Sequence, residues 1–177
     1  EANKILRIIH ELIRACGPSG MVSGQSLDMS ELNQPNTNEE TLTKVHNLKT
    51  GKLIAACVKM TLTSTNADKK TTDILNNFAI DLGILFQMQD DYLDQYTNNN
   101  CSGKLRSSDK ANNKITFANI YTKNKLLEIV QTKYDKIMRN LNPIADQSNK
   151  LRQILLCLKN KIQINPEKNS THIDSYQ

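Results

Sequence analysis

The chain has 177 residues, of which 23% are charged and 38% hydrophobic, and its formal net charge is +5. This length and balance are typical of one soluble domain with a packed core. The longest apolar run, "LIAACV", is short and lies between Lys52 and Lys59, well below the roughly 18 apolar residues of a membrane span. We therefore expect no membrane span.

The four cysteines, Cys16, Cys57, Cys101 and Cys157, are widely spaced and form no CxxC pair. The reduced thiols of a cytoplasmic protein are therefore expected rather than a metal or redox centre. The positive charge could serve nucleic acid, as a basic helical binding module. However, the chain has neither zinc-finger spacing nor an RNP-like aromatic motif, and aromatic residues are only 5%. We expect no nucleic-acid partner.

Helical periodicity runs through most of the chain, and no strand-like alternation is sustained. The first helix is expected over 1–16 with an apolar stripe, and "GPSG" ends it. A short helical segment is expected in "MVSGQSLDM". Thr37, three residues before Glu40, is typical of a capping box, so the next helix is expected over 38–62.

The second part of the chain also has a helical pattern. A helix is expected over 69–96, and "TNNNCSGK" has the composition of a loop. "NKITFANIY" could open another helix. Further helices are expected over 123–141 and 145–162, with a boundary at Pro143. The predicted fold is all-α, with one domain over 1–164 and a polar, disordered tail over 165–177.

The stretch "FQMQDDYLDQY" places Asp90, Asp91 and Asp94 at the end of a long predicted helix. A helix C-terminus favours positive charge, and Asp90 and Asp94, one turn apart, repel each other. A bound Mg²⁺ would remove this conflict, because Mg²⁺ takes one or two carboxylates together with waters and substrate phosphate oxygens. The alternative is a solvated acidic surface.

Basic residues follow the acidic cluster directly. Lys104, Arg106, Lys110 and Lys114 fall within eleven residues, in a stretch that contains Gly103. Carboxylates with metal beside a basic loop would suit a diphosphate. Solvated surface remains the alternative for the basic residues alone.

Two glycine-containing stretches predict close packing or a second part of the same site. In "HNLKTGKL", Gly51 interrupts a helical pattern at a cost of about 1 kcal/mol, which indicates a kink or a close approach. Lys49 and Thr50 could bind phosphate oxygens or simply lie at the surface, and His46 favours a structural role. In "GMVSGQSLD", Gly20 and Gly24 predict a tight helix crossing. The same segment could place Gln25 and Asp28 inside, where buried polar groups need partners.

Four segments together resemble one family. "GMVSGQSLD", "HNLKTGKL", "FQMQDDYLD" and "SGKLRSSDKANNKITF" occur in the order and spacing of trans-polyprenyl diphosphate synthases, most like bacterial farnesyl diphosphate synthase. The resemblance covers about 1–161 and implies an isoprenoid-synthase-type helical bundle of which this chain holds the C-terminal helices. It also implies a homodimer for the full-length enzyme.

The resemblance implies a Mg²⁺-dependent condensation of isopentenyl diphosphate with an allylic diphosphate such as dimethylallyl or geranyl diphosphate. Asp90 would be a direct Mg²⁺ ligand, with Asp91 and Asp94 acting directly or through waters. Substrate-binding and catalytic roles fall on a further set of residues. Lys49, Lys104 and Lys114 would bind diphosphate, Thr50 and Gln87 would lie by the reacting carbons, and Phe86 would form a pocket wall.

This sequence also departs from the family pattern. The family's first DDxxD motif and its isopentenyl diphosphate residues are absent, so we expect the C-terminal portion of a synthase with little or no activity by itself. A non-catalytic subunit of a heteromeric synthase is the alternative. Ser107 and Phe117 replace a usual Gly and Tyr, and both replacements look tolerable.

Overall fold

The computed structural model describes residues 1–65, 67–96 and 114–163, and these residues form helices and turns without a strand. The elements are α1 (Ala2–Cys16), α2 (Met21–Ser30), α3 (Glu39–His46), the π-helical turn η1 (Asn47–Gly51), α4 (Lys52–Ser64), α5 (Lys69–Tyr96), α7 (Phe117–Ile120), α8 (Lys123–Asn140), the 3₁₀ helix η3 (Asn142–Gln147) and α9 (Asn149–Gln163). The all-α prediction is confirmed. The predicted loop in "TNNNCSGK", the domain boundary at 164 and the tail over 165–177 lie outside the described residues.

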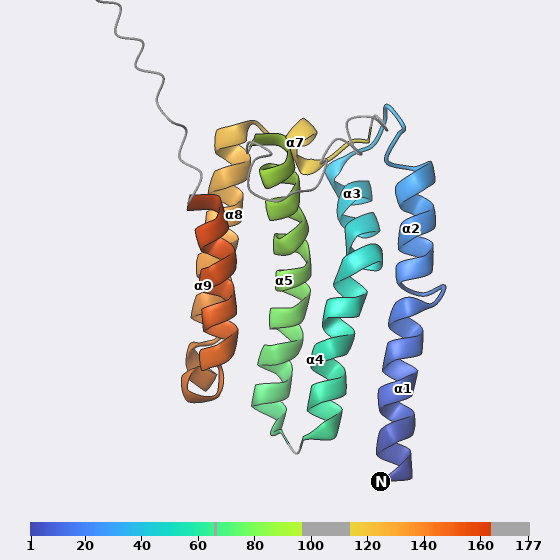
Figure 1. Ribbon diagram of the computed structural model, residues 1–177, viewed down its shortest axis with the longest axis vertical. Coiled ribbons are helices and arrows are strands. Elements are labelled where there is room, and N and C mark those ends of the chain that lie inside the picture. The colour runs from blue at the N-terminus through green and yellow to red at the C-terminus, as the bar shows by residue number, and fades with distance from the viewer. Residues whose placement is uncertain (66, 97–113, 164–177) are drawn as a thin grey trace, which may run out of the picture.

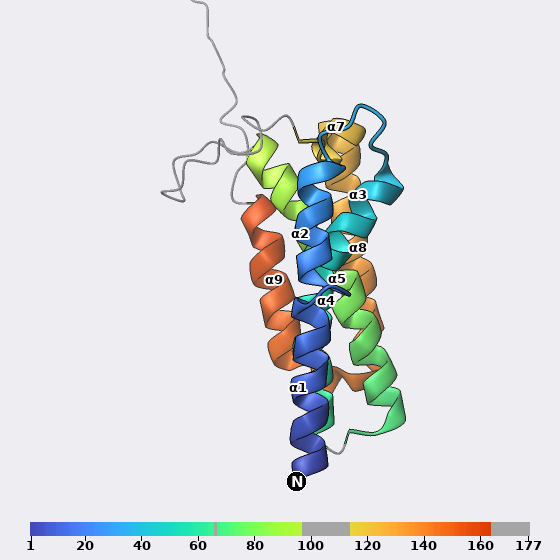
Figure 2. The same cartoon turned by 90° about the vertical axis from the view of Figure 1, so that its right-hand side faces the viewer.

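The helices run side by side along the long axis of the molecule (Figure 1). One column contains α1 and α2 end to end, the next contains α3, η1 and α4, and α5 follows (Figure 1). Helices α8 and α9 follow after α5, and in the turned view α9 lies to the left and α8 to the right (Figure 2). The C-terminal end of α5, α7 and the start of α3 share one end of the molecule, so segments distant in sequence meet there.

The core is built around α5 and α8. Phe78, Leu85 and Met88 of α5 pack with the apolar face of α8, and residues of α3, α7 and α9 close the same cluster. The buried α8 residues are Leu126, Val130, Tyr134 and Ile137. Their spacing of three and four positions is the helical period that the sequence predicts. Because α5 packs one face against these residues, the opposite face of α5 is left for other contacts.

The predicted capping residue of α3 and the predicted start of the last helix are wrong, and both errors have local causes. Asn38, not Thr37, is the N-cap of α3, because its Oδ1 accepts a hydrogen bond from the Thr41 N–H at 2.9 Å. The Thr37 hydroxyl instead donates to the carbonyl of Glu31 at 2.6 Å. The last helix begins at Asn149 rather than Ala145, because the chain after Leu141 forms the 3₁₀ helix with a proline in its first turn.

The apolar stripe of α1 is the largest difference between the expected core and the observed one. Helix α1 packs on α4, but the residues of the stripe stay exposed: Ile5, Leu6, Ile9, Leu12 and Ile13. Ala15 is the residue that α1 buries. The stripe is one face of α1, so the helix is amphipathic with its apolar face uncovered. None of the described helices combines the length and the apolarity that crossing a membrane requires.

Candidate active site

Asp28 of α2 accepts hydrogen bonds from two of the predicted substrate-binding lysines, Lys49 and Lys114. Its Oδ2 accepts hydrogen bonds from the Nζ of Lys49 at 3.0 Å and from the Nζ of Lys114 at 2.5 Å. Asp28 is only 3% exposed, whereas the Lys49 side chain is 34% exposed. One buried carboxylate therefore holds two cations at the edge of solvent, from segments 21 and 86 positions away in the chain.

The protonation of Asp28 reflects this arrangement. Burial acts to raise the pKa of the Asp28 carboxyl, but the hydrogen bonds from Lys114 and Lys49 outweigh it and hold that pKa below its ordinary value. The carboxylate is therefore charged at neutral pH. Since two lysines share one carboxylate, the group retains one positive charge that can attract an anion.

The glycines of the two motifs set the position of Lys49. A Cβ atom on Gly24 would lie 2.2 Å from the backbone N of Lys49, so α2 and the π turn touch backbone to backbone. A Cβ atom on Gly83 of α5 would lie 2.8 Å from the Cα of Gly51. The tight crossing is confirmed at Gly24 but not at Gly20, which packs on the end of α1, and the predicted irregularity at Gly51 is confirmed. The irregularity is a π-helical turn, a feature that is frequent at functional sites.

The same glycine contacts bring Thr50 and Gln87 to one crossing. Thr50 directly precedes Gly51, and Gln87 lies one turn beyond Gly83 on α5. Both side chains are half-buried. The two oxygen-bearing residues are therefore helical neighbours of the Gly51–Gly83 contact, where η1 packs on α5.

The segment before α7 connects the lysine pair to the acidic end of α5. Lys114 bonds Asp28, the N–H of Ile115 donates to the Leu32 carbonyl at 2.8 Å, and the N–H of Phe117 donates to Oδ2 of Asp91 at 2.8 Å. Four consecutive residues can span only about 10–11 Å between their first and last Cα atoms. The lysine pair on Asp28 and the carboxylate cluster are thus held near each other by a short segment of chain, referred to below as the tether.

His46 and Phe117 complete the support for this tether. The Phe117 ring is fully buried and stacks on the His46 ring with centroids 5.6 Å apart. The Nε2 of His46 lies 3.9 Å from Oδ2 of Asp91. This environment agrees with the structural role predicted for His46, and it explains why a phenyl ring without a hydroxyl suits position 117.

The three aspartates of the acidic cluster lie in different surroundings. Asp90 is exposed, and Asp94 is half-buried one turn later on the face that also carries Phe86, itself 39% exposed. Asp91 has a side chain only 11% exposed and accepts the Phe117 N–H. Asp91 therefore links α5 to α7, whereas Asp90 is the carboxylate that α5 presents to solvent.

The donor set around Asp90 fits Mg²⁺ only when a ligand contributes. Within the described residues no three His, Cys, Asp or Glu side chains converge as a metal site. Mg²⁺ is commonly held by one or two carboxylates plus waters and substrate phosphate oxygens. Asp90, with Asp94 one turn away, fits that incomplete pattern, and the cations at Lys49 and Lys114 would face the phosphate part.

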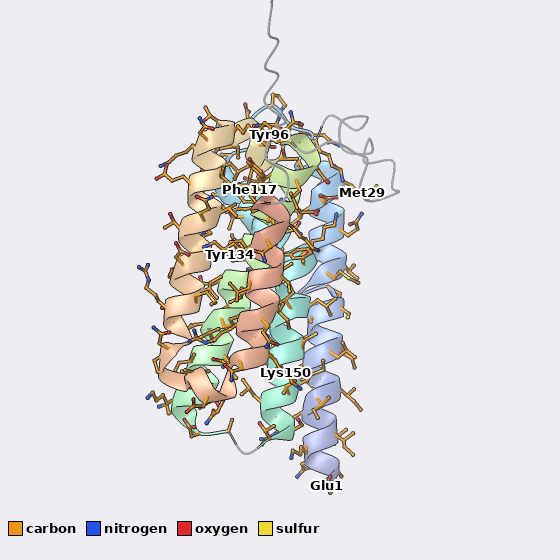
Figure 3. The ribbon with its side chains drawn as sticks, turned by 60° about the vertical axis from the view of Figure 1, so that its left-hand side comes forward. Glu1, Met29, Tyr96, Phe117, Tyr134 and Lys150 are labelled. Atoms are coloured by element: carbon orange, nitrogen blue, oxygen red, sulfur yellow. The ribbon has the colours of Figure 1, made fainter. Side chains whose placement is uncertain are left out.

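A buried polar network fixes α5 one residue before Asp90. The hydroxyl of Tyr134 donates to Oε1 of Gln89, and the Nε2 of Gln89 donates to the Leu158 carbonyl at 2.6 Å. Burial raises the pKa of the Tyr134 phenol, so the hydroxyl remains a donor. Figure 3 shows Tyr134 in the middle of the molecule, with Tyr96 and Phe117 near the end that carries the site. The network joins α5, α8 and α9.

The predicted site residues are brought together only in part. Asp28, which the predicted catalytic set omits, is the residue that unites Lys49 and Lys114, and its place in an otherwise apolar segment was the signal for it. Gln25, for which an inside position was one of two alternatives, is exposed, because α2 turns Gly24 and Asp28 toward the π turn. Lys104 lies outside the described residues.

A comparison with known families identifies the arrangement. The sequence profile of the polyprenyl synthetase family matches residues 1–156. The chain belongs to the polyprenyl synthetase family. The farnesyl diphosphate synthase of Bacillus subtilis is 39% identical over 119 residues, which are 67% of this chain and 40% of that protein. The farnesyl diphosphate synthase of Geobacillus stearothermophilus is 40% identical over 112 residues, 63% of this chain and 37% of that protein.

Solved structures of bacterial geranyltransferases share the fold. A geranyltransferase from Legionella pneumophila is similar with a TM-score of 0.80 and 34% identity, over 93% of this chain and 52% of that one. A geranyltransferase from Helicobacter pylori, complexed with magnesium and isoprenyl diphosphate, is similar with a TM-score of 0.77 and 30% identity, over 93% and 54%. The chain thus spans about half the length of these solved structures.

Proposed function

We propose that this chain is the diphosphate-binding half of a Mg²⁺-dependent, cytoplasmic short-chain prenyltransferase. The proposed reaction joins isopentenyl diphosphate to dimethylallyl or geranyl diphosphate and gives a product such as farnesyl diphosphate. The observation that carries the proposal is that Asp28 hydrogen-bonds both Lys49 and Lys114. The segment from Lys114 to Phe117 connects this lysine pair to the acidic end of α5. Membership of the polyprenyl synthetase family supports the same chemistry.

In this proposal the lysines bind the allylic diphosphate. Asp28 fixes the Nζ atoms of Lys49 and Lys114 before substrate arrives, and Lys104 adds a third cation. Such preorganised charge favours the transition state, where negative charge develops on the leaving group. Asp90, with Asp91 and Asp94 directly or through waters, would hold Mg²⁺, which supplies further neutralisation of the diphosphate when bound.

The π turn and α5 would then stabilise the carbon side of the reaction. The allylic C–O bond breaks with its electron pair leaving on the diphosphate. The double bond of isopentenyl diphosphate attacks the resulting cation, a C–C bond forms and a proton is lost. The oxygens of Thr50 and Gln87 flank the η1–α5 crossing, where their dipoles would face the positive carbon. The exposed ring of Phe86 would form the wall beside it.

The chain by itself is proposed to have little or no synthase activity. Its sequence holds one aspartate-rich motif, in "QDDYLD", and lacks the family's first DDxxD motif and the residues that would bind isopentenyl diphosphate. A homodimer is proposed for the full-length enzyme. The exposed stripe of α1 supports this part of the proposal, since a contiguous exposed apolar face commonly marks a surface that another chain covers.

A chimera tests the function. The half of the Legionella geranyltransferase that this chain does not match is fused ahead of Glu1, and the product is incubated with Mg²⁺, geranyl diphosphate and isopentenyl diphosphate. We expect farnesyl diphosphate from the chimera, loss of product by at least about 100-fold with Asp90→Ala, and almost none from the 177-residue chain. Robust synthesis by the chain alone would refute the proposed incompleteness.

The alternative, a non-catalytic subunit, predicts a different result. Its chimera would fold but would neither bind diphosphate in a Mg²⁺-dependent way nor form product. The retained Asp28, Lys49 and Asp90 favour the catalytic proposal, because a subunit without catalysis has no reason to hold two lysines on a buried carboxylate.

A further inference from the structure

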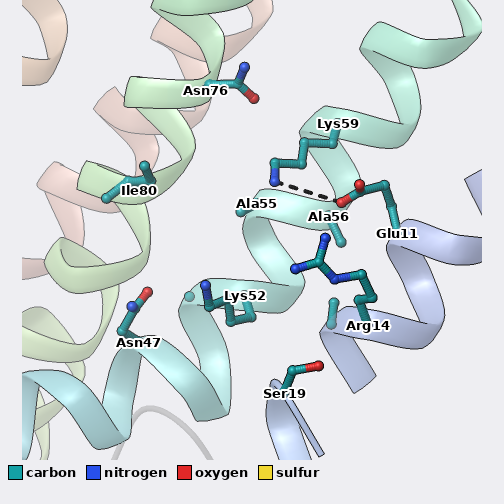
Figure 4. Close-up of a pocket in the computed structure, with 12 residues that line it drawn as sticks. Glu11, Arg14, Ser19, Asn47, Lys52, Ala55, Ala56, Lys59, Asn76 and Ile80 are labelled. Carbon is teal, nitrogen blue, oxygen red and sulfur yellow. Dashed lines mark ion pairs between the residues drawn. The ribbon is translucent and has the colours of Figure 1, made fainter. Parts of the chain in front are cut away.

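A pocket of about 200 Å³ lies outside the candidate active site, between α1, α4 and α5 (Figure 4). Its lining is rich in cations: Arg14 comes from α1, and Lys52 and Lys59 come from α4. Glu11 is the acidic residue among the described residues that line it. The pocket takes no part in the arrangement around Asp28 and Asp90.

The charges of this pocket are unbalanced. The Nζ of Lys59 lies 3.7 Å from Oε2 of Glu11, and this pair is approximately neutral (Figure 4). Arg14 and Lys52 form no ion pair with any residue in the described part of the chain. The two positive charges of Arg14 and Lys52 therefore line the same pocket without a counter-charge from the described residues. A dianion such as a phosphate monoester would be attracted to it, and a guanidinium can bind two phosphate oxygens at once.

The pocket also contains an amide without a partner. Oδ1 of Asn76 on α5 is buried and has no hydrogen-bond partner among the described residues. A buried acceptor left without a donor is costly, so a group that supplies a hydroxyl would be favoured there. The volume lies below the 300–1,000 Å³ usual for drug-sized ligands. A phosphate with a small polyol fits this description, whereas a long isoprenoid chain does not.

The pocket lies behind the turn that carries Lys49 and Thr50. Asn47 and Gly51, at the two ends of η1, contribute to its lining. Lys49, between them, points to Asp28 instead. A ligand in the pocket would therefore contact the π turn from the side opposite to the lysine pair.

We propose that this pocket binds a small hydroxylated phosphate monoester through Arg14 and Lys52, with its hydroxyl on Asn76. The ligand would contact η1 at Asn47 and Gly51, on the side away from Asp28, so its binding could regulate the position of the turn. The described lining contains no pair of carboxylates that could hold a metal. The proposal does not depend on the prenyltransferase function, since it uses none of the residues assigned to that reaction.

Amide shifts of the ¹⁵N-labelled chain, titrated without Mg²⁺, test the proposal. Glycerol 3-phosphate and inorganic phosphate are added separately at constant ionic strength. We expect saturable shifts at Asn47, Gly51 and Asn76, and affinity lowered about tenfold by Lys52→Gln. Lys70→Gln, an exposed change of equal charge at the start of α5, should leave the affinity unchanged. Lys49→Gln should also leave these shifts in place, which separates the pocket from the candidate active site.

The Asn76→Ala variant tests the hydroxyl contact. It should weaken glycerol 3-phosphate and leave the affinity for inorganic phosphate nearly unchanged. Three results would overturn the proposal: shifts that do not saturate, equal losses with Lys52→Gln and Lys70→Gln, or shifts confined to the surroundings of Lys49 and Lys114.

Discussion

The Nζ of Lys114 lies 2.5 Å from Oδ2 of Asp28, although 86 positions separate the two residues in the chain. Lys49 reaches the same oxygen at 3.0 Å. This shared carboxylate connects α2, the π turn and the segment before α7. It gives the cationic part of the site a fixed position before any ligand binds, and its loss should affect folding as well as binding.

Replacing Asp28 with asparagine should lower the free energy of unfolding by about 1–3 kcal/mol, because it leaves two lysines without their buried counter-charge. Asp81→Asn is the matched control. Asp81 pairs with Lys136 at 3.2 Å in a more exposed position, where an ion pair contributes about 0–1 kcal/mol. Urea unfolding at pH 7 measures both variants. Equal losses would show that burial of Asp28 adds nothing.

The free energy of unfolding should depend on pH through protonation of the Asp28 carboxylate. Because the pKa of Asp28 is lower in the folded chain than in the unfolded one, its contribution is present above the unfolded value of about 3.9. The contribution is then lost as the pH falls through the lower folded pKa. The stability difference between wild type and Asp28→Asn should therefore be constant from pH 5 to 7 and shrink below about pH 4. A difference that grows on acidification would contradict this assignment.

Gly24→Ala should disrupt the packing that positions Lys49. The added Cβ would lie 2.2 Å from the Lys49 N and 2.5 Å from its Cα, and backbone cannot move aside as a side-chain end can. We expect a loss of about 1–3 kcal/mol or more. Ser26→Ala, an exposed change on the same helix, should have little effect. Thermal unfolding compares the two, and an unchanged Tm for Gly24→Ala would show that α2 does not touch η1.

Asp90 and Asp91 should separate ligand binding from stability. Asp91→Ala removes the acceptor of the Phe117 N–H and should cost about 1–2 kcal/mol of stability. Asp90→Ala should cost less stability but remove Mg²⁺-dependent diphosphate binding. Denaturant unfolding and calorimetry on both variants decide the matter. Two variants with the same profile would mean that the adjacent aspartates have one role.

Tyr134→Phe should weaken the junction of α5, α8 and α9. Without the hydroxyl, Oε1 of Gln89 is left buried and unsatisfied, at a cost of about 1–3 kcal/mol. Tyr96→Phe is a suitable comparison, since the Tyr96 hydroxyl makes only a 3.5 Å contact with the Ala118 carbonyl. We expect the smaller loss for that variant in the same unfolding measurement.

The sequence predicted the helices better than it predicted their faces. The bounds of α5 match the prediction because its apolar residues recur with the helical period between Lys69 and Tyr96. The helix contains no proline, and its one glycine, Gly83, packs against Gly51 and does not end the helix. The core side of α1 was not predictable, because periodicity identifies an apolar stripe but not the neighbour that covers it. Asn38 displaced Thr37 as N-cap because adjacent residues with similar capping ability compete, and the loop decides between them.

The candidate site was predictable as a set of motifs but not as a geometry. Nothing in the spacing of Asp28, Lys49 and Lys114 shows that one oxygen would hold both amines, since that contact arises from packing at Gly24. The different surroundings of Asp90 and Asp91 likewise depend on where the Phe117 N–H lies. Sequence patterns identify residue types that suit a reaction. The tertiary contacts then separate residues that could bind a ligand, such as Asp90, from residues that position them, such as Asp28.

The most direct test of the central claim is a calorimetric titration of the chain with inorganic pyrophosphate, with and without Mg²⁺. We predict saturable binding that requires Mg²⁺, is lost with Asp90→Ala and Lys49→Gln, and persists with Asp73→Ala, an exposed acidic control on the same helix. Binding that is indifferent to Mg²⁺, or that survives Asp90→Ala unchanged, would contradict the claim that the end of α5 holds magnesium against a diphosphate.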